Sequence, residues 1–178
     1  MSKYSYLINT AEGDVEMMQK KVDLAINLRN AGRKKESNEL LVKLVENSPK
    51  DAFINYQCAW SFDILGDESE AVPFYENAIN LGLSGKDLEG AIVGLGSTYR
   101  TLGEYEKSKQ VLLKGMDLFP NNKAIQVFYS LTLYNLKEHD RAMELLLTCL
   151  IDTSSDNEIL SYKKALNFYS DKLNETGK

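Results

Sequence analysis

The chain has 178 residues, of which 43% are hydrophobic and 26% charged, so it has the length and composition of one ordinary globular domain. Its formal net charge of −5 leaves no basic surface that would attract phosphates, which argues against a nucleic-acid partner. No stretch approaches the roughly 20 consecutive apolar residues that a membrane-spanning helix needs, so no membrane association is expected.

Residues 1–12 are expected to form an N-terminal tail. They lack the long apolar core and small-residue cleavage site of a secretory signal, which favours a cytoplasmic protein. The tail is nevertheless unusually apolar, because it contains Tyr4, Tyr6, Leu7 and Ile8. Two alternatives remain open: the tail is disordered, or it lies in a groove of its own chain or of a second copy.

A short turn signal recurs along the rest of the chain. Gly32, Gly66 and Gly103 each follow Ala or Leu, and Lys137 follows Leu136 at the corresponding place of a degenerate fourth copy. The spacings between these four positions are 34, 37 and 34 residues. Self-similarity with a period in this range is typical of stacked supersecondary units. The sequence therefore predicts a repeat architecture.

Each repeat contains two apolar runs with helical period, separated by the turn. A glycine after the first run can adopt the left-handed conformation that ends a helix. Asp67 stands where it would cap the second helix of its repeat. The prediction is a solenoid over 13–156 with four helix-turn-helix repeats, at about 18–51, 52–85, 89–122 and 123–156. Residues 86–88 form an insertion between the second and third repeats.

These repeats resemble the tetratricopeptide repeat family, whose 34-residue pattern has small, apolar and aromatic residues at fixed places. The third repeat carries the pattern well, with Leu95, Gly96, Tyr99, Gly103, Tyr105, Ser108, Leu112, Gly115 and Pro120. The second matches it at Cys58, Ala59, Phe62, Gly66, Ala71, Tyr75 and Ala78. The resemblance implies an all-α, right-handed superhelical solenoid of about four helix pairs, closed by a C-terminal capping helix.

A narrower resemblance concerns residues 55–60, 81–85 and 95–100. They are similar to a group of small bacterial tetratricopeptide repeat proteins that have no assigned activity. Membership of that group implies that the protein acts as a homodimer.

Residues 157–178 are expected to be the capping helix and a short tail. One helical stripe runs from 157 to about 173, made of Ile159, Tyr162, Leu166, Tyr169 and Leu173. Ser155 and Glu158 have the spacing of a capping box at its start. Leu160 and Phe168 widen the stripe beyond what one neighbouring helix covers, which leaves apolar surface for another contact.

A partner-binding groove is implied by the family resemblance, because fixed positions of each first helix line one face. Seven residues are expected to contact a partner there: Tyr56, Trp60, Asp63, Arg100, Leu131, Tyr134 and Asn135. Trp60 and Tyr56 are the strongest candidates, because large rigid aromatic side chains bury much area at little entropic cost. Arg100 would hold a carboxylate or a carbonyl oxygen. The alternative is that some of these residues only pack between neighbouring helices.

A catalytic or metal site is not indicated. The sole histidine, His139, lies in the fourth inter-helix turn, with no Ser, Cys or carboxylate spaced to use it. Residues 94–96 lack the third glycine of a dinucleotide loop, and residues 152–158 lack the central glycine of a calcium loop. Cys58 and Cys149 lie inside helical patterns and are expected to be buried free thiols. We therefore expect no catalytic residue, no metal and no cofactor.

The sequence favours a non-enzymatic interaction module that binds a peptide or protein segment in its concave groove. Some family members clamp a C-terminal carboxylate with Lys and Asn, but Val22, Ile26, Tyr56 and Trp60 occupy those positions here. An adaptor for such carboxylate tails is therefore disfavoured. The alternative function is a homodimeric assembly protein whose groove or terminal helix is used for self-association.

Overall fold

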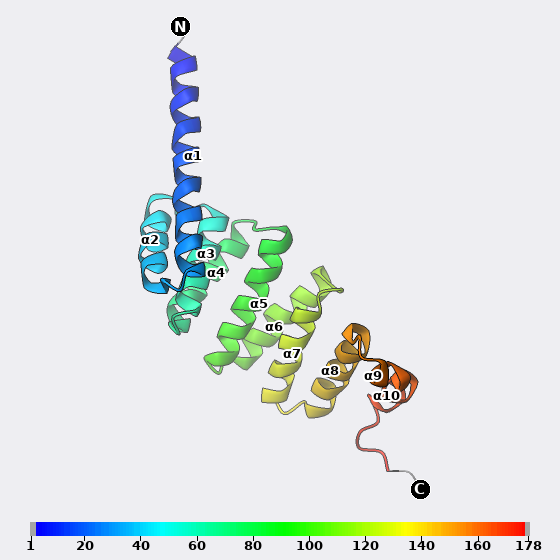
Figure 1. The fold of residues 1–178 in the computed structure, drawn as a ribbon. Helices are drawn as coiled ribbons and strands as arrows, with labels where there is room; N and C mark the ends of the chain where they lie inside the picture. Colours follow the sequence, from blue (N-terminus) through cyan, green and yellow to red (C-terminus); the bar gives the residue numbers. More distant parts are fainter. Residues whose placement is uncertain (1–2, 177–178) are drawn as a thin grey trace. The chain divides into compact units, whose positions relative to one another are not determined.

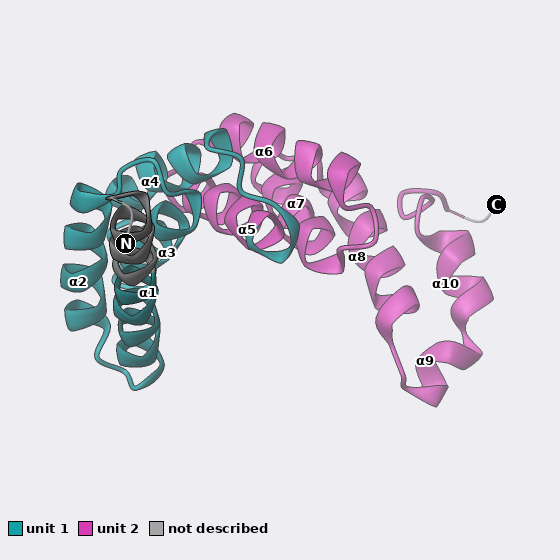
Figure 2. Cartoon of the chain, turned by 90° about the horizontal axis from the view of Figure 1, so that it is seen from above, with its two compact units in different colours: residues 1–87 teal, residues 88–178 magenta. Residues whose placement is uncertain are grey.

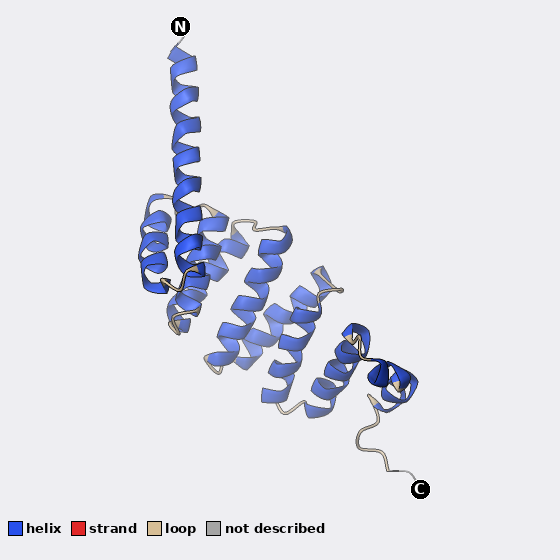
Figure 3. Cartoon of the chain, viewed as in Figure 1, coloured by secondary structure: helices blue, strands red, loops and turns tan. Residues whose placement is uncertain are grey.

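Helices account for all regular secondary structure in the part of the chain that the structure describes. The structure is a computed structural model that describes residues 3–176, with side chains from residue 16 onward. Ten α-helices follow one another in this range and no strand occurs in it (Figure 1; Figure 3). The predicted all-α class is confirmed.

The chain divides into two compact units, Met1–Asp87 and Leu88–Lys178 (Figure 2). Unit 1 contains α1 (Lys3–Asn30), α2 (Lys34–Asn47), α3 (Ala52–Asp63) and α4 (Glu68–Asn80). Helix α5 (Gly85–Thr101) begins at the end of unit 1 and continues into unit 2. Unit 2 also contains α6 (Tyr105–Leu118), α7 (Lys123–Asn135), α8 (His139–Thr153), α9 (Asn157–Ser161) and α10 (Lys163–Tyr169).

Helices that are consecutive in the chain pack against each other within each unit. In unit 1, α1 packs on α2, α2 on α3 and α3 on α4, and α1 also contacts α3. In unit 2, α6 packs on α7, α7 on α8, and α10 on α8. None of the described helices is long and apolar enough to cross a membrane.

Helix α1 begins at Lys3 and so includes most of residues 1–12, which were expected to form a tail. The side chains of residues 1–15 are outside the described part of the structure. The prediction that apolar tail side chains occupy a groove therefore concerns side chains that the structure does not describe.

The turns inside the helix pairs share one backbone geometry. Gly66 has a φ of +82°; its N–H donates to the carbonyl of Asp63, and the N–H of Asp67 donates to the carbonyl of Phe62, both at 3.1 Å. These two bonds define the Schellman motif, which ends a helix with a left-handed residue. The same pair of bonds closes the turns at Gly32, Gly103 and Lys137. The predicted left-handed glycines are confirmed.

The prediction that Asp67 caps α4 with its side chain is wrong. Asp67 precedes α4, but its side chain makes no capping hydrogen bond. Its ψ of 57° lies outside the extended region that a side-chain cap requires. The Schellman bond from its own N–H to Phe62 holds the backbone in that conformation.

The core of unit 1 lies where α1, α2 and α3 meet. Six buried side chains form it: Val22, Ala25, Leu41, Leu44, Ile54 and Cys58. Both cysteines are buried and free, as predicted.

Two buried serines each form a hydrogen bond between the two helices of a pair. The hydroxyl of Ser37 donates to the carbonyl of Ala25, and that of Ser108 donates to the carbonyl of Gly96, both at 2.7 Å.

The C-terminal segment consists of two short helices rather than one continuous helix. Helix α9 ends at Ser161, whose hydroxyl donates to the carbonyl of Glu158 at 2.7 Å, while the N–H of Tyr162 donates to Ile159 instead. Side-chain bonds of this kind compete with the regular helical ladder. The predicted capping box at Ser155 is wrong by one position, because Asp156 accepts the N–H groups of Glu158 and Ile159.

Candidate functional site

The aromatic surface of unit 1 is built mainly on α3. The ring of Tyr56 lies 6.0 Å from that of Trp60 with an interplanar angle of 23°, and 6.3 Å from that of Tyr75 on α4. Tyr56 is only 8% exposed, whereas Trp60 is 39% exposed. Tyr56 is therefore a buried residue that packs against Trp60, whereas part of the Trp60 ring is exposed to solvent.

Arg29 of α1 covers part of the same ring. Its guanidinium carbon lies 3.7 Å from the centroid of Trp60, and its Nη2 donates to Oε1 of Gln57 at 2.9 Å. Burial lowers the pKa of Arg29, but an arginine remains charged at neutral pH. A cation this close to an aromatic face is attracted by the ring quadrupole. The contact joins α1 to α3 and fixes the orientation of Trp60.

Asp63 lies at the end of α3, and its carboxylate is held by a neighbour. The hydroxyl of Tyr75 donates to Oδ2 of Asp63 at 3.2 Å. Burial, together with the negative charge of Asp63, raises the pKa of the Tyr75 hydroxyl. The hydroxyl is therefore protonated at neutral pH and available as a donor.

A cavity of about 490 Å³ opens in unit 1 between α1 and the start of α3. Its lining comes from α1, from the α2–α3 connection and from the first turn of α3, and comprises Met18, Gln19, Val22, Ser48, Asp51, Phe53 and Ile54. The exposed side chains of Gln19 and Asp51 mark the side that faces solvent. Gln19, Val22 and Phe53 belong to the positions that line the groove in the family pattern.

The predicted site residues of unit 2 form a separate surface on α5 and α7. Nη1 of Arg100 donates to Oδ1 of Asn135 at 3.3 Å, which joins the two helices. Leu131 and Tyr134 are 37% and 60% exposed. The Tyr134 ring lies 4.7 Å from the ring of His139 at the start of α8. Unit 2 thus offers one apolar and one aromatic side chain beside a polar pair.

The seven predicted residues are divided between the two units. Tyr56, Trp60 and Asp63 lie together on α3 of unit 1, whereas Arg100, Leu131, Tyr134 and Asn135 lie on α5 and α7 of unit 2. The predicted set omitted Arg29, although it has the same place in its repeat as Asp63, Arg100 and Tyr134. It also omitted the cavity residues, although the family pattern places three of them, Gln19, Val22 and Phe53, at groove positions.

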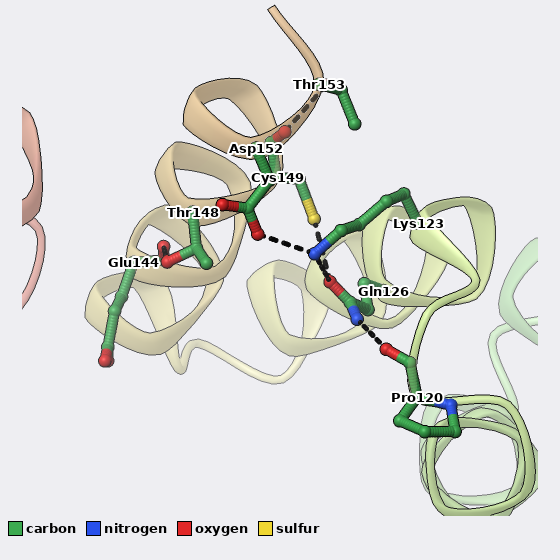
Figure 4. A network of polar contacts seen from close by, with 8 residues as sticks. All are labelled: Pro120, Lys123, Gln126, Glu144, Thr148, Cys149, Asp152 and Thr153. Atoms are coloured by element: carbon green, nitrogen blue, oxygen red, sulfur yellow. Dashed lines mark hydrogen bonds and ion pairs between the residues drawn. The ribbon is translucent and has the colours of Figure 1, made fainter. Parts of the chain in front are cut away.

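A polar network connects α7 and α8 in unit 2 (Figure 4). Lys123 contacts Asp152 at 2.8 Å and Gln126 at 3.2 Å, and Gln126 donates to the carbonyl of Pro120 at 2.7 Å. The thiol of Cys149 donates to Oε1 of Gln126 at 3.2 Å. Lys123 lowers the pKa of Asp152 by hydrogen bonding, and burial raises that of Cys149. The network links helices and holds a protonated thiol, so it does not supply a nucleophile.

Metal binding has no candidate ligand set among the side chains of residues 16–176, where no group of three or more His, Cys, Asp or Glu is placed to hold an ion. The described surfaces have groups that can contact the side chains of a partner. Trp60 offers the exposed part of its ring, the cavity a partly apolar wall, and Arg100 with Asn135 a set of hydrogen-bonding groups.

Paired helices joined by Schellman turns and packed on their sequence neighbours define a helical-repeat protein. The Tetratrico peptide repeat family model matches residues 3–55 and 52–173. The chain therefore belongs to the tetratricopeptide repeat family, as its sequence pattern predicted.

Solved structures with the same fold share little sequence identity with the chain. A MamA fragment from Desulfovibrio magneticus RS-1 has 14% identity and a TM-score of 0.69, with 86% of this chain and 85% of that chain covered. PilF of Pseudomonas aeruginosa has 18% identity and a TM-score of 0.67, with 88% and 70% covered. YrrB, described as a TPR protein with an unusual peptide-binding site, has 15% identity and a TM-score of 0.68, with 93% and 87% covered. No curated protein matches the sequence.

Proposed function

We propose that this protein is a non-enzymatic, cytoplasmic interaction module that binds a segment of a partner protein on the faces of its first helices. The tetratricopeptide repeat fold supports protein interaction as the general function. The observation that carries the more specific proposal is that neighbouring side chains fix the orientation of the exposed Trp60 ring. Its exposed ring contacts both the ring of Tyr56 and the guanidinium of Arg29, so little conformational entropy is lost when a partner packs on it.

Each unit contributes its own surface to this proposal. In unit 1, Trp60 is the aromatic anchor, Tyr56 supports it, and Asp63 can accept a hydrogen bond. In unit 2, Leu131 and Tyr134 provide apolar contact, and Arg100 with Asn135 provides polar groups. The solved structure of YrrB offers a precedent for peptide binding in this fold, at an identity too low to transfer any residue.

The test is an affinity pull-down from the native cell with purified wild-type protein and a Trp60→Ala variant. A matched control is Phe168→Ala, which removes an exposed aromatic side chain from α10, outside the surfaces on α3, α5 and α7. A partner that is retained by wild type and Phe168→Ala but lost with Trp60→Ala supports the proposal. Equal recovery with all three proteins, each shown to be folded by circular dichroism, contradicts it.

A second candidate function is self-association through the C-terminal end of unit 2. Large apolar side chains on α8, α9, α10 and the residues after them are exposed: Leu150, Leu160, Tyr162, Phe168, Tyr169 and Leu173. A capping element normally has a polar outer face, so this surface favours a second copy as its contact. Light scattering should then give a dimer mass for the wild type and a monomer mass for Phe168→Glu, with Trp60→Glu unchanged. A monomeric wild type contradicts this candidate.

A further inference from the structure

The cavity of unit 1 is large enough to receive a large side chain of a partner. Its volume of about 490 Å³ lies within the range of about 300 to 1,000 Å³ that is usual for ligand sites. Part of its wall is apolar, from Met18, Val22, Phe53 and Ile54. An apolar side chain placed there would be removed from water, which is favourable, and would contact a preformed wall.

The charge beside this cavity is negative. Among the lining side chains that the structure describes, which begin at residue 16, Asp51 is the charged one. Oδ1 of Asp51 accepts the N–H of Ile54 at 2.9 Å as the cap of α3, which fixes where the carboxylate points. An ionised carboxylate has acceptor capacity for further donors, so it can also pair with a cation. Gln19 adds an exposed amide on the opposite wall.

We infer that the cavity between α1 and α3 binds a large apolar side chain of a partner segment, and that Asp51 pairs with a basic residue next to that side chain. This inference rests on the proposed function and names the chemistry of the segment. An acidic neighbour is disfavoured, because it would face the Asp51 carboxylate.

The distance from the cavity to Trp60 sets the spacing of the recognised segment. Phe53, in the cavity wall, and Trp60 are seven residues apart on α3, or about 10 Å along a helix axis at about 1.5 Å per residue. An extended chain covers that distance in about three residues. The segment therefore has a second contact residue about three positions from the anchor, where it packs on the ring of Trp60.

The experiment selects displayed random 12-residue peptides on the full chain and measures their affinity for each variant by isothermal titration calorimetry. Gln19→Phe places a benzyl group in the cavity from an exposed position. Lys20→Phe is the matched control, because Lys20 is exposed on the same helix and does not line the cavity. Asp51→Asn keeps an N-capping side chain and removes only the charge.

The expected peptides have a large apolar residue beside Lys or Arg. Their affinity should fall at least about tenfold with Gln19→Phe and stay within about twofold with Lys20→Phe. Asp51→Asn should weaken them about threefold, and added salt should remove that difference. If Gln19→Phe does not fold, the Asp51→Asn result and the selected sequences decide the question alone.

Two results would overturn the inference. Selected peptides that bind Gln19→Phe as well as wild type, but lose affinity for Trp60→Ala, exclude the cavity and leave the proposed function intact. Selected peptides with acidic residues beside the apolar one also contradict it. Selection of no peptide at all contradicts both the inference and the proposed peptide binding.

Discussion

The guanidinium of Arg29 stacks 3.7 Å from the centre of the Trp60 ring, and this contact ties the first helix of unit 1 to the third. Arg29 also donates to Gln57, one turn before Trp60 on α3. A planar guanidinium can stack and donate at the same time, which an ammonium group cannot do equally well. The contact between Arg29 and Trp60 therefore holds the tryptophan ring in one orientation.

Replacing Arg29 with Lys should loosen the Trp60 ring without removing the positive charge. We expect the free energy of unfolding to fall by about 1 kcal/mol, because the stacking and the bond to Gln57 are lost. Acrylamide should quench the Trp60 fluorescence more strongly in the variant. The control is Arg33→Lys, which changes an exposed arginine that pairs with Glu36 on the surface. Quenching unchanged by Arg29→Lys would show that the stack does not hold the ring.

The sequence was sufficient to predict the elements that depend on local signals. Gly32, Gly66 and Gly103 could be read as left-handed helix ends because glycine adopts that conformation at little cost. The spacing of these glycines then predicted the repeats and the family. Burial of Cys58 and Cys149 followed from their places in apolar helical patterns.

Contacts between helices could not be predicted in the same way. The stack of Arg29 on Trp60 depends on how closely α1 approaches α3, and no spacing in the sequence encodes that approach. No signal in the sequence places Asp51 beside Gln19 and Phe53 on one cavity, because these residues come from different helices and a connection. The break at Tyr162 depended on a hydroxyl bond that an apolar stripe does not reveal.

Lys137 carries the left-handed conformation that glycine carries in the other three turns. Its φ is +67°, and the turn makes the same two Schellman bonds. A side chain in this conformation costs about 1 to 2 kcal/mol, partly offset by the lower backbone entropy of a non-glycine residue. Lys137→Gly should therefore stabilise the protein by about 0.5 to 1 kcal/mol in urea unfolding.

The reverse substitution, Gly66→Lys, is the matched control for Lys137→Gly. A Cβ at Gly66 would meet no atom within 4 Å, so only the backbone strain changes. We expect a loss of about 1 to 2 kcal/mol. A Lys137→Gly variant that is less stable than wild type would show that the lysine side chain stabilises this turn.

Gly96 allows α5 and α6 to pack closely in unit 2. A Cβ built on Gly96 would lie 2.5 Å from Cγ of Leu112, which is fully buried. Gly96→Ala should lower the free energy of unfolding by about 1 to 3 kcal/mol through overpacking. Leu112→Ala should cost about 2 to 5 kcal/mol, and the double variant should cost clearly less than the sum, because the added methyl then has room. Additive losses in urea unfolding would contradict this contact.

The two cysteines should be unreactive toward thiol reagents while the protein is folded. Burial raises the pKa of Cys58 to about 12 and also raises that of Cys149, whereas an exposed thiol has a pKa of about 8.5. The thiolate is the reactive form, so raising the pH from 7 to 9 increases the reactive fraction of an exposed thiol but leaves Cys58 protonated, and it increases that of Cys149 less than that of an exposed thiol. We expect slow modification by a chromogenic disulfide over this range, and rapid release of two equivalents in guanidinium. In Cys149→Ala, Cys58 should remain equally protected, and rapid modification of native Cys58 at pH 8 would contradict its burial.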